Sequence, residues 1–285
     1  MSEGRRAFAP ASLLSRYDSF MLPEQQNRLV VVLVRARNPS NIGAVARGMH
    51  DFGFSHLRVV NEYPVPFEAA QAAEKAAVHA SSVLDAAAQP ASVAEAVADC
   101  TLILGTTAVG DRKLDHPLLS LDDAAWLINQ TLSRDPLAKV ALLFGSEKTG
   151  LSNDELSHCK ILVTIPMNTS RAQDDPVRHL SMNLGQAAAV CLYAISHDKT
   201  FVMRGIEQFP ATATAGELER LMKLLTEVLE RSGYMRRHPA NAREGVLRRL
   251  VWRNYSSSED ATIWTGILRQ LLHVLPSRLS DEGPL

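Results

Sequence analysis

The stretch "RLVVVLVRARNPSNIGAVARGMHDFGF", residues 28–54, decides the fold class because an apolar run passes through a polar turn straight into a helix. The opening run is continuously apolar, as strands buried on both faces are. Apolar residues then recur at helical spacing, which predicts a helix over 41–52 with one core-facing stripe. The stripe consists of Ile42, Val45, Met49 and Phe52. A strand that leads directly into a helix is the repeating unit of a parallel α/β sheet.

The predicted helix also carries one long cation among very small residues. At about 100° per residue, Arg47 points nearly opposite the apolar stripe. Its neighbours on that side are Gly43, Ala44 and Ala46. We expect these small residues to let another surface approach Arg47 closely, which makes the arginine a candidate functional residue.

The same alternation of strand and helix continues to about residue 196. Continuous apolar runs predict strands at 28–34, 56–60, 101–106, 139–145 and 160–166. Predicted helices occupy 41–52, part of the alanine-rich region 69–98, 121–132, a segment that opens with the capping box Ser152-x-x-Glu155, and the apolar stretch 184–195. Strands that alternate with helices predict an α/β fold with a parallel sheet.

Four segments follow from this pattern. We expect a flexible extension at 1–27, the α/β domain at 28–196, a linker at 197–214 and a small helical module at 215–285. Within that module, 231–253 holds seven arginines and one glutamate, so its net charge is 7 − 1 = +6 with His238 neutral. A polyanion-binding surface is favoured over a solvated helix face because compensating acids are missing. The candidate contacts are Arg236, Arg237, Arg243, Arg248 and Arg249.

Composition bounds the remaining possibilities. The 285 residues are 46% hydrophobic and 21% charged with a net charge of -1, which is typical of a soluble globular protein. No apolar run reaches the roughly 18 residues that a membrane span requires. The three cysteines, Cys100, Cys159 and Cys191, form no CxxC pair, which argues against a zinc site and a disulfide framework. We therefore expect buried cysteines, no metal and a cytoplasmic location.

Three strand ends carry small and polar residues where an open parallel sheet binds its ligands. They read "GTTA" at 105–108, "FGSEKTGLS" at 144–152 and "IPMN" at 165–168, the last leading to "HLSMNLGQ" at 179–186. A phosphate-binding P-loop is disfavoured because Leu151 and Ser152 follow Gly150 where lysine and Ser/Thr are required. No dinucleotide fingerprint follows any strand. Ser181 stands near His179, but this spacing alone carries almost no catalytic information.

Taken together, "NPSNIGAVARGMHDFGF", "LLFGSEKTGLS" and "LSMNLGQAAAVCLYAI" resemble the three motifs of the SPOUT-superfamily RNA methyltransferases, in the TrmH-like 2′-O-ribose branch. The helical tail "ELERLMKLLTEVLERSGY" and "NAREGVLRRLVWRN" resembles the C-terminal extension of the TrmJ group, which methylates the ribose of nucleotide 32 in the tRNA anticodon loop. The resemblance covers about nine-tenths of the chain.

This resemblance implies a sheet with a C-terminal trefoil knot, S-adenosylmethionine as cofactor, tRNA as substrate and a homodimer. In such a dimer the motif-one arginine of one subunit faces cofactor bound mainly by the other. Residues matching the family's cofactor pocket are Thr106, Thr107, Ala108, Gly145, Ile165, Leu180, Ser181 and Met182. Residues on its polar motif positions are Asn41, Arg47, Glu147, Ser181 and Asn183. Val109 stands where relatives often have arginine, so Arg112 is expected to substitute for it as an RNA contact.

The implied chemistry gives each polar residue a role. Arg47 would hydrogen-bond the ribose 2′-oxygen and stabilise the developing alkoxide, because an arginine side chain stays protonated and is a poor general base. Asn41 and Ser181 would orient the arginine and ribose, and Glu147 would anchor a neighbouring subunit or loop. Ribosomal RNA or another tRNA position, and a non-catalytic RNA-binding role, remain alternatives. Deletion of 205–285 is expected to weaken tRNA binding far more than cofactor binding.

Overall fold

The computed structural model describes residues 21–61, 80–108, 116–167, 181–197, 212–253 and 257–275. Its centre is a six-stranded, all-parallel sheet with the strand order β2-β1-β5-β3-β6-β4. The strands are β1 (Leu29–Val34), β2 (His56–Val60), β3 (Leu102–Thr106), β4 (Leu118–Ser120), β5 (Val140–Phe144) and β6 (Ile161–Thr164). The five predicted strands are confirmed. The sixth, β4, is only three residues long and pairs with β6 at the edge, so it left no apolar run to recognise.

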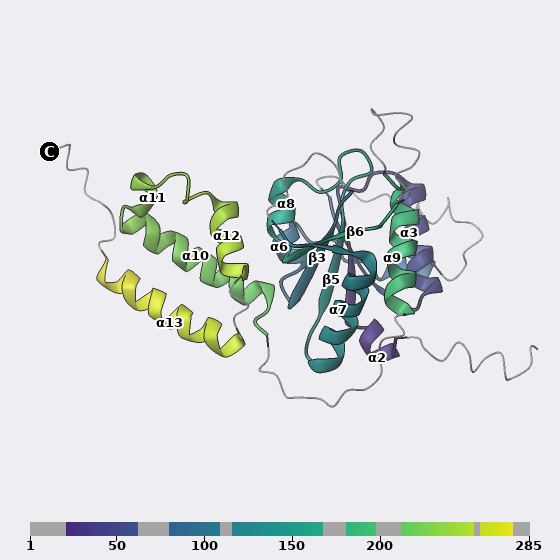
Figure 1. Ribbon diagram of the computed structural model, residues 1–285, viewed down its shortest axis with the longest axis horizontal. Helices are drawn as coiled ribbons and strands as arrows, with labels where there is room; N and C mark the ends of the chain where they lie inside the picture. Colours follow the sequence, from purple (N-terminus) through teal and green to yellow (C-terminus); the bar gives the residue numbers. More distant parts are fainter. Residues whose placement is uncertain are drawn as a thin grey trace, which may run out of the picture.

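Both faces of the sheet are covered, as the continuous apolar strands predict (Figure 1). One face packs against α3 (Pro39–Asp51), α7 (Leu121–Arg134) and α9 (Leu184–Ser196). The opposite face packs against the short helices α6 (Val93–Ala96) and α8 (Asn153–Ser157). Within β1, Leu29, Val31 and Leu33 belong to the first cluster and their neighbours to the second. Helix α5 (Ser81–Asp85) contacts α3 and β2.

Helix α3 shows why the opening stretch folds as it does, and where its interpretation needs correction. Asn38 caps the helix by accepting a hydrogen bond from the Ser40 backbone N–H at 3.0 Å, and Pro39 follows in the first turn. The predicted apolar stripe is buried except for Phe52, which is partly buried. Gly43 and Ala46 are buried as well, so the face beside Arg47 is not an open bed of small residues.

The small residues of α3 pack mainly against α9 of the same chain. A Cβ atom added to Gly185 of α9 would lie 2.6 Å from the Ala44 Cβ, so the two helices approach closely only because that position is glycine. Gly48 also faces α9, where an added Cβ would lie 3.6 Å from Ala189, an ordinary van der Waals distance. The expectation that these residues admit a foreign surface is therefore wrong for Ala44: its small size serves intrachain helix packing.

Residues 21–27 differ from the expected flexible extension over 1–27, because they pack on the α/β domain. From Met21 onward the chain packs on the α/β domain: the Met21 backbone N–H donates to the Ser196 carbonyl at 3.0 Å. Helix α2 (Pro23–Gln26) contacts α7, and its buried Gln25 donates to the Ser133 hydroxyl at 2.7 Å. Residues 1–20 lie outside the described part of the chain.

Four further helices follow, α10 (Ala215–Arg231), α11 (Tyr234–Arg237), α12 (Glu244–Arg253) and α13 (Ser258–Val274), and together we call them the helical unit. In Figure 1 this unit lies beyond α6 and α8, on the side of the sheet opposite α3 and α9. Thr214 and Glu217 form a capping box that starts α10, so the expected linker ends by Thr212 at the latest. Most of that linker, 198–211, is outside the described residues.

The helical unit is joined to the α/β domain by backbone and apolar contacts. The Ala215 backbone N–H donates to the Cys100 carbonyl and the Gly216 N–H to the Ala98 carbonyl, both at 2.7 Å. One continuous apolar cluster runs from the sheet face through α6 and α8 to Leu218, Met222 and Trp252. Removal of the helical unit would expose this cluster to water. The effect expected of deleting 205–285 stays a prediction, and single substitutions in the helical unit test RNA binding without exposing the cluster.

Two other expectations concern the whole chain. All three cysteines are buried and free of disulfides, as expected of small apolar side chains. Among the described residues, no helix is long and apolar enough to cross a membrane.

Candidate active site

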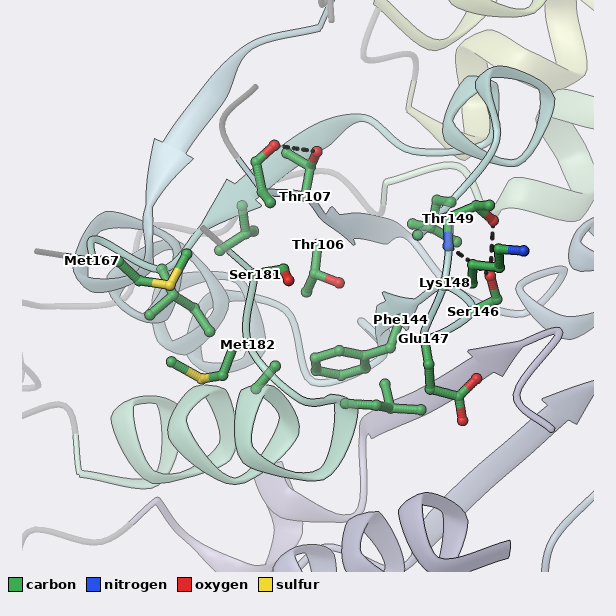
Figure 2. A pocket seen from close by; sticks show the side chains of 18 residues that line it. Thr106, Thr107, Phe144, Ser146, Glu147, Lys148, Thr149, Met167, Ser181 and Met182 are labelled. Carbon is green, nitrogen blue, oxygen red and sulfur yellow. Dashed lines mark hydrogen bonds between the residues drawn. The ribbon is translucent and has the colours of Figure 1, made fainter. Parts of the chain in front are cut away.

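A pocket of about 520 Å³ opens at the carboxyl ends of β3, β5 and β6. In Figure 2, Thr106 and Ser181 lie near its middle, with Met167 and Met182 on one side and the loop carrying Ser146 and Thr149 on the other. We call the loops around this pocket, together with the β1–α3 turn, the pocket edge. Its position agrees with the rule that open parallel sheets bind ligands beyond the carboxyl ends of their strands.

Backbone geometry forms one wall of the pocket. A Cβ atom on Gly145 would lie 2.1 Å from the Gly150 carbonyl carbon and 2.2 Å from the Leu151 nitrogen, so only glycine fits where these segments cross. Gly150 has a φ of +65°, a conformation that side chains disfavour. Its N–H donates to the Ser146 carbonyl at 2.9 Å and closes the loop. The resulting surface lets a flat ligand approach the backbone closely.

The third strand contributes hydroxyl and backbone groups. The Thr106 hydroxyl donates to the Leu143 carbonyl at 2.9 Å, and the Thr107 N–H donates to the Val163 carbonyl at 2.9 Å. These bonds tie the ends of β3, β5 and β6 together beside the cavity. Every residue expected in the cofactor pocket lines this cavity, apart from Leu180, which lies outside the described residues: Thr106, Thr107, Ala108, Gly145, Ile165, Ser181 and Met182.

Asn183, Asn41 and Glu147 form a hydrogen-bonded chain that joins the three sequence motifs. The Asn183 Nδ2 donates to the Asn41 Oδ1 at 2.9 Å, and the Asn41 Nδ2 donates to the Glu147 Oε1 at 3.1 Å. The Asn38 backbone N–H donates to the same carboxylate oxygen at 3.3 Å. Asn41 is buried, and its amide is engaged on both sides, so it fixes the loops and does not face the pocket. Of the two roles expected for Glu147, loop anchoring matches these contacts.

The electrostatics of Glu147 follow from these contacts. Burial alone would raise the pKa of its carboxyl group, but hydrogen bonds from the Asn41 side chain and from three backbone N–H groups outweigh burial. The pKa is therefore lowered, and the carboxylate remains charged at neutral pH. Figure 2 shows the Glu147 side chain directed away from the middle of the pocket. The Glu147 carboxylate therefore holds the loop in place through Asn38 and Asn41, and it does not point at the middle of the pocket.

Arg47 does not line this pocket. It lies on α3 with its side chain 48% exposed, and its Nε is 3.8 Å from the Asp51 Oδ2. The structure thus brings Ser181 to the cavity and places Glu147 in its lining. Asn41 and Asn183 are not among the lining residues, and Arg47 lies outside the cavity of its own chain.

The expected RNA contact Arg248 needs correction. Its side chain is only 6% exposed and donates to Glu219 Oε1 at 2.8 Å, Glu244 Oε1 at 2.6 Å and the Ser157 hydroxyl at 2.8 Å. We call this contact of α8 with α10 and α12 the junction. Because its donors serve other protein groups, Arg248 is not available to a phosphate. Arg236, Arg237 and Arg243 are exposed and Arg249 is half-buried, whereas Arg112 lies outside the described residues.

The junction also buries a histidine. Burial first, and then the charge of Arg248, lowers the pKa of His158 to about 4. Glu219 lies 3.6 Å from its Nδ1, but the same oxygen already accepts from Arg248, so the histidine is neutral at pH 7.

Sequence reasoning missed several residues of the pocket. Phe144, Ser146, Lys148, Thr149, Val163, Met167, Leu184 and Ala187 also line it. Four of these eight are apolar residues in strands or helices, and the sequence does not say which apolar side chain ends at a cavity. Lys148 stands in the second motif beside Glu147, but no spacing rule distinguished it from a surface lysine. Among the described residues, no group of three or more His, Cys, Asp or Glu side chains is arranged to hold a metal ion.

The fold and the pocket define a class of protein. The sequence profile of the SpoU rRNA Methylase family matches residues 28–193, which span all six strands and the pocket. The chain therefore belongs to the SpoU methylase family, a family of methyltransferases.

Individual relatives of this chain include tRNA methyltransferases named TrmJ. The chain is 33% identical over 272 residues to the tRNA (cytidine/uridine/adenosine-2′-O-)-methyltransferase TrmJ of Pseudomonas aeruginosa, covering 90% of this chain and 99% of the relative. It is 32% identical over 246 residues to the tRNA (cytidine/uridine-2′-O-)-methyltransferase TrmJ of Sodalis glossinidius, covering 85% and 91%. The crystal structure of TrmJ from Z. mobilis superposes with a TM-score of 0.68 at 30% identity, covering 85% of this chain and 98% of that one.

Proposed function

We propose that this chain is an S-adenosylmethionine-dependent tRNA methyltransferase that modifies the 2′-hydroxyl of a cytidine or uridine at nucleotide 32 of the anticodon loop. The observation that carries the proposal is the pocket: the three motifs meet there around a wall in which a Cβ on Gly145 would lie 2.1 Å from Gly150. The TrmJ relatives named above match nearly the full length of the chain, which supports tRNA as the substrate.

The residues around the pocket fit S-adenosylmethionine. Backbone groups of Thr107, Ala108 and the loop after Gly145 suit a flat base and a ribose, while Ile165 and Met182 offer apolar contact. When bound, this cofactor supplies an electrophilic methyl group. The trefoil knot belongs to the same proposal, and the insertion of β6 between β3 and β4 supports it. Residues 168–180 lie outside the described part of the chain.

Arg47 is the residue to which we assign catalysis. A ribose 2′-hydroxyl is a weak acid, so its proton leaves more readily when a fixed cation stabilises the negative charge on the oxygen. An arginine guanidinium donates hydrogen bonds but, because it stays protonated, does not act as a proton acceptor. Phosphate or water then takes the proton. Ser181, inside the pocket, orients the ribose.

Arg47 requires a second copy of the chain for this role. It is absent from the pocket of its own chain, and the face of α9 near α3 exposes Val190 and Tyr193. The Tyr193 ring packs edge-on against Phe52, which directly follows α3, and stacks on His197 with ring centroids 4.2 Å apart. This partly apolar aromatic face suits a homodimer in which Arg47 of one subunit reaches the pocket of the other.

Three exposed arginines and one half-buried arginine of the helical unit complete the proposal as the tRNA-binding surface. Arg236, Arg237, Arg243 and Arg249 are the candidate phosphate contacts, and Arg248 is excluded because it is buried. Phosphate contacts release counterions, so tRNA affinity should fall as salt concentration rises.

Mapping the modified nucleotide tests the proposal. We expect the purified chain with S-adenosylmethionine and total RNA to add one ribose methyl group at nucleotide 32, read by mass spectrometry of digested tRNA. Arg47→Ala should lose this activity yet bind S-adenosylmethionine normally, whereas the exposed Arg269→Ala on α13 should retain both. Methylation of ribosomal RNA or of another tRNA position would contradict the assigned target. Absence of cofactor binding would support a non-catalytic RNA-binding protein.

A further inference from the structure

Arg35 stands out at the carboxyl end of β1. Among the described residues it is the one non-glycine residue with a positive φ, 58°. Its backbone N–H still donates to the Val60 carbonyl at 2.8 Å and so continues the pairing of β1 with β2. A side chain in this left-handed conformation is strained, and such strain persists where the surroundings hold the residue in place. The contacts of the Arg35 side chain therefore show what holds this residue in its strained conformation.

The guanidinium of Arg35 joins two segments beyond its own strand. Nε donates to Glu155 Oε1 at 2.6 Å, and Nη2 donates to Glu155 Oε2 at 3.0 Å. Nη2 also donates to the Gly150 carbonyl at 3.0 Å. Glu155 is itself fixed, because its carboxylate accepts from the Ser152 backbone N–H in the capping box of α8. A planar fork of donors suits this two-point contact with a carboxylate.

Gly150 is the residue through which this contact reaches the pocket. A Cβ atom on Gly145 would lie 2.1 Å from the carbonyl carbon of Gly150, and Gly150 lines the cavity. The same loop is held at Glu147 by Asn38 and Asn41. The segment 35–41 thus pins the pocket loop at two points. Arg35 does not itself line the pocket.

We infer that Arg35 is a positioning residue for the cofactor pocket: its left-handed backbone and its fork to Glu155 hold the Gly150 carbonyl, so that the Gly145–Leu151 loop is shaped before the ligand arrives. The inference rests on the proposed function, in which this pocket binds S-adenosylmethionine. A loop fixed in its binding conformation loses less freedom on binding, which raises affinity without a direct contact.

Arg35→Gly separates positioning from general stability. Glycine adopts a positive φ without strain, so the variant keeps the backbone path and loses only the side-chain contacts. We expect its dissociation constant for S-adenosylmethionine to rise about tenfold, as for a lost charge-assisted hydrogen bond. KM for the cofactor should rise similarly, with kcat at saturation nearly unchanged. Arg35→Lys keeps the positive charge but lacks the two-point contact of the guanidinium. Its dissociation constant should lie between those of the wild type and Arg35→Gly.

Arg28→Gln is the matched control at the other end of β1. Arg28 also holds loops in place, since it donates to the carbonyls of Asp135 at 2.7 Å and Ala138 at 3.1 Å, but it is far along the strand from the pocket. We expect this control to lower Tm and to leave cofactor affinity unchanged. Calorimetric titration with S-adenosylmethionine and thermal melting measure both quantities for all four chains.

The outcomes separate the two claims. A weakened cofactor affinity in Arg35→Gly, with Tm at or near the wild-type value, supports the inference. An unchanged affinity in Arg35→Gly, whatever its Tm, overturns the inference and leaves the proposed function standing. If the wild-type chain itself does not bind S-adenosylmethionine, the proposed function fails and the inference fails with it.

Discussion

The pocket edge and the junction both gather polar side chains, but they use them in opposite ways. At the pocket edge, Asn41, Asn183 and Glu147 bind one another and the backbone, and the cavity beside them stays open. At the junction, the side chains of Arg248 and His158 are only 6% and 8% exposed, and the donors of Arg248 are engaged within the protein. The pocket edge shapes a binding surface. The junction buries charged groups and joins the α/β domain to the helical unit.

The comparison teaches which sequence signals are trustworthy. Glycine and asparagine at strand ends marked places where backbones meet, and the structure brings them together. Arginine counts marked charge without saying whether that charge reaches the surface. The predictions below test this contrast, starting with the largest expected effect.

Gly145→Ala should weaken cofactor binding more than any other substitution proposed for this chain. Its new Cβ would lie 2.1 Å from the Gly150 carbonyl carbon, and because this neighbour is backbone, the pocket loop itself must shift. We expect affinity for S-adenosylmethionine to fall on the order of 100-fold, the scale of strain from overpacking. Calorimetric titration measures the change.

Gly266→Ala on α13 is the control for that substitution. A Cβ there has nothing within 4 Å, and the residue is exposed inside a helix. The alanine should stabilise the protein by about 1 kcal/mol through helix propensity and should not change cofactor affinity. If both alanines weaken binding equally, the close crossing at Gly145 is not what shapes the pocket.

Arg248→Met should destabilise the junction strongly. The Glu219 side chain is only 16% exposed. The substitution would leave this mostly buried carboxylate without its arginine partner. We expect a loss of about 3 kcal/mol in the free energy of unfolding, as when one member of a buried ion pair is removed. Urea denaturation measures it.

Arg243→Gln supplies the contrast with Arg248→Met. Arg243 is exposed, so its replacement should change stability by less than about 0.5 kcal/mol while reducing the salt dependence of tRNA binding by about one unit of slope. A folded Arg248→Met protein whose tRNA salt dependence drops in the same way would show that Arg248 does contact phosphate.

His158 should make the junction sensitive to acid, with a smaller effect. Its pKa is about 4 in the folded protein against about 6.5 when unfolded, so the folded chain binds fewer protons between these values. The stability that depends on its neutral form is complete above about pH 6.5 and is lost progressively as the pH falls toward 4. His158→Gln should therefore lose less Tm between pH 7 and pH 5 than the wild type does. Equal losses in both proteins would place the acid sensitivity elsewhere.

Local pattern was sufficient for much of the fold. The run 28–34 and the stripe beginning at Ile42 predicted β1 and α3, and the Ser152–Glu155 capping box predicted the start of α8, because these signals depend only on near neighbours. Features set by distant partners were not predictable. Ala46 is buried because α3 has packing partners on more than one side, and Arg248 is buried because Glu219, 29 residues away, accepts its hydrogen bond.

The candidate site shows the same division. The motifs identified Gly145 and Ser181, whose positions are fixed by the backbone, and both line the pocket. The sequence did not indicate Arg35, because its positive φ and its hydrogen bond to Gly150 arise only when β1 and the loop after β5 lie side by side. No periodicity in a single sequence records such a contact.

The central claim is that Arg47 of one subunit completes the pocket of its partner. The most direct measurement mixes the variants Arg47→Ala and Gly145→Ala under conditions that exchange subunits. tRNA methylation is then assayed at a cofactor concentration too low to fill the Gly145→Ala pocket, so that neither variant is active alone. The account predicts that activity returns to about one quarter of the wild-type value, because half of the dimers are mixed and each of these has one complete site. If the mixture stays inactive although mixed dimers form, Arg47 does not act across the subunit interface.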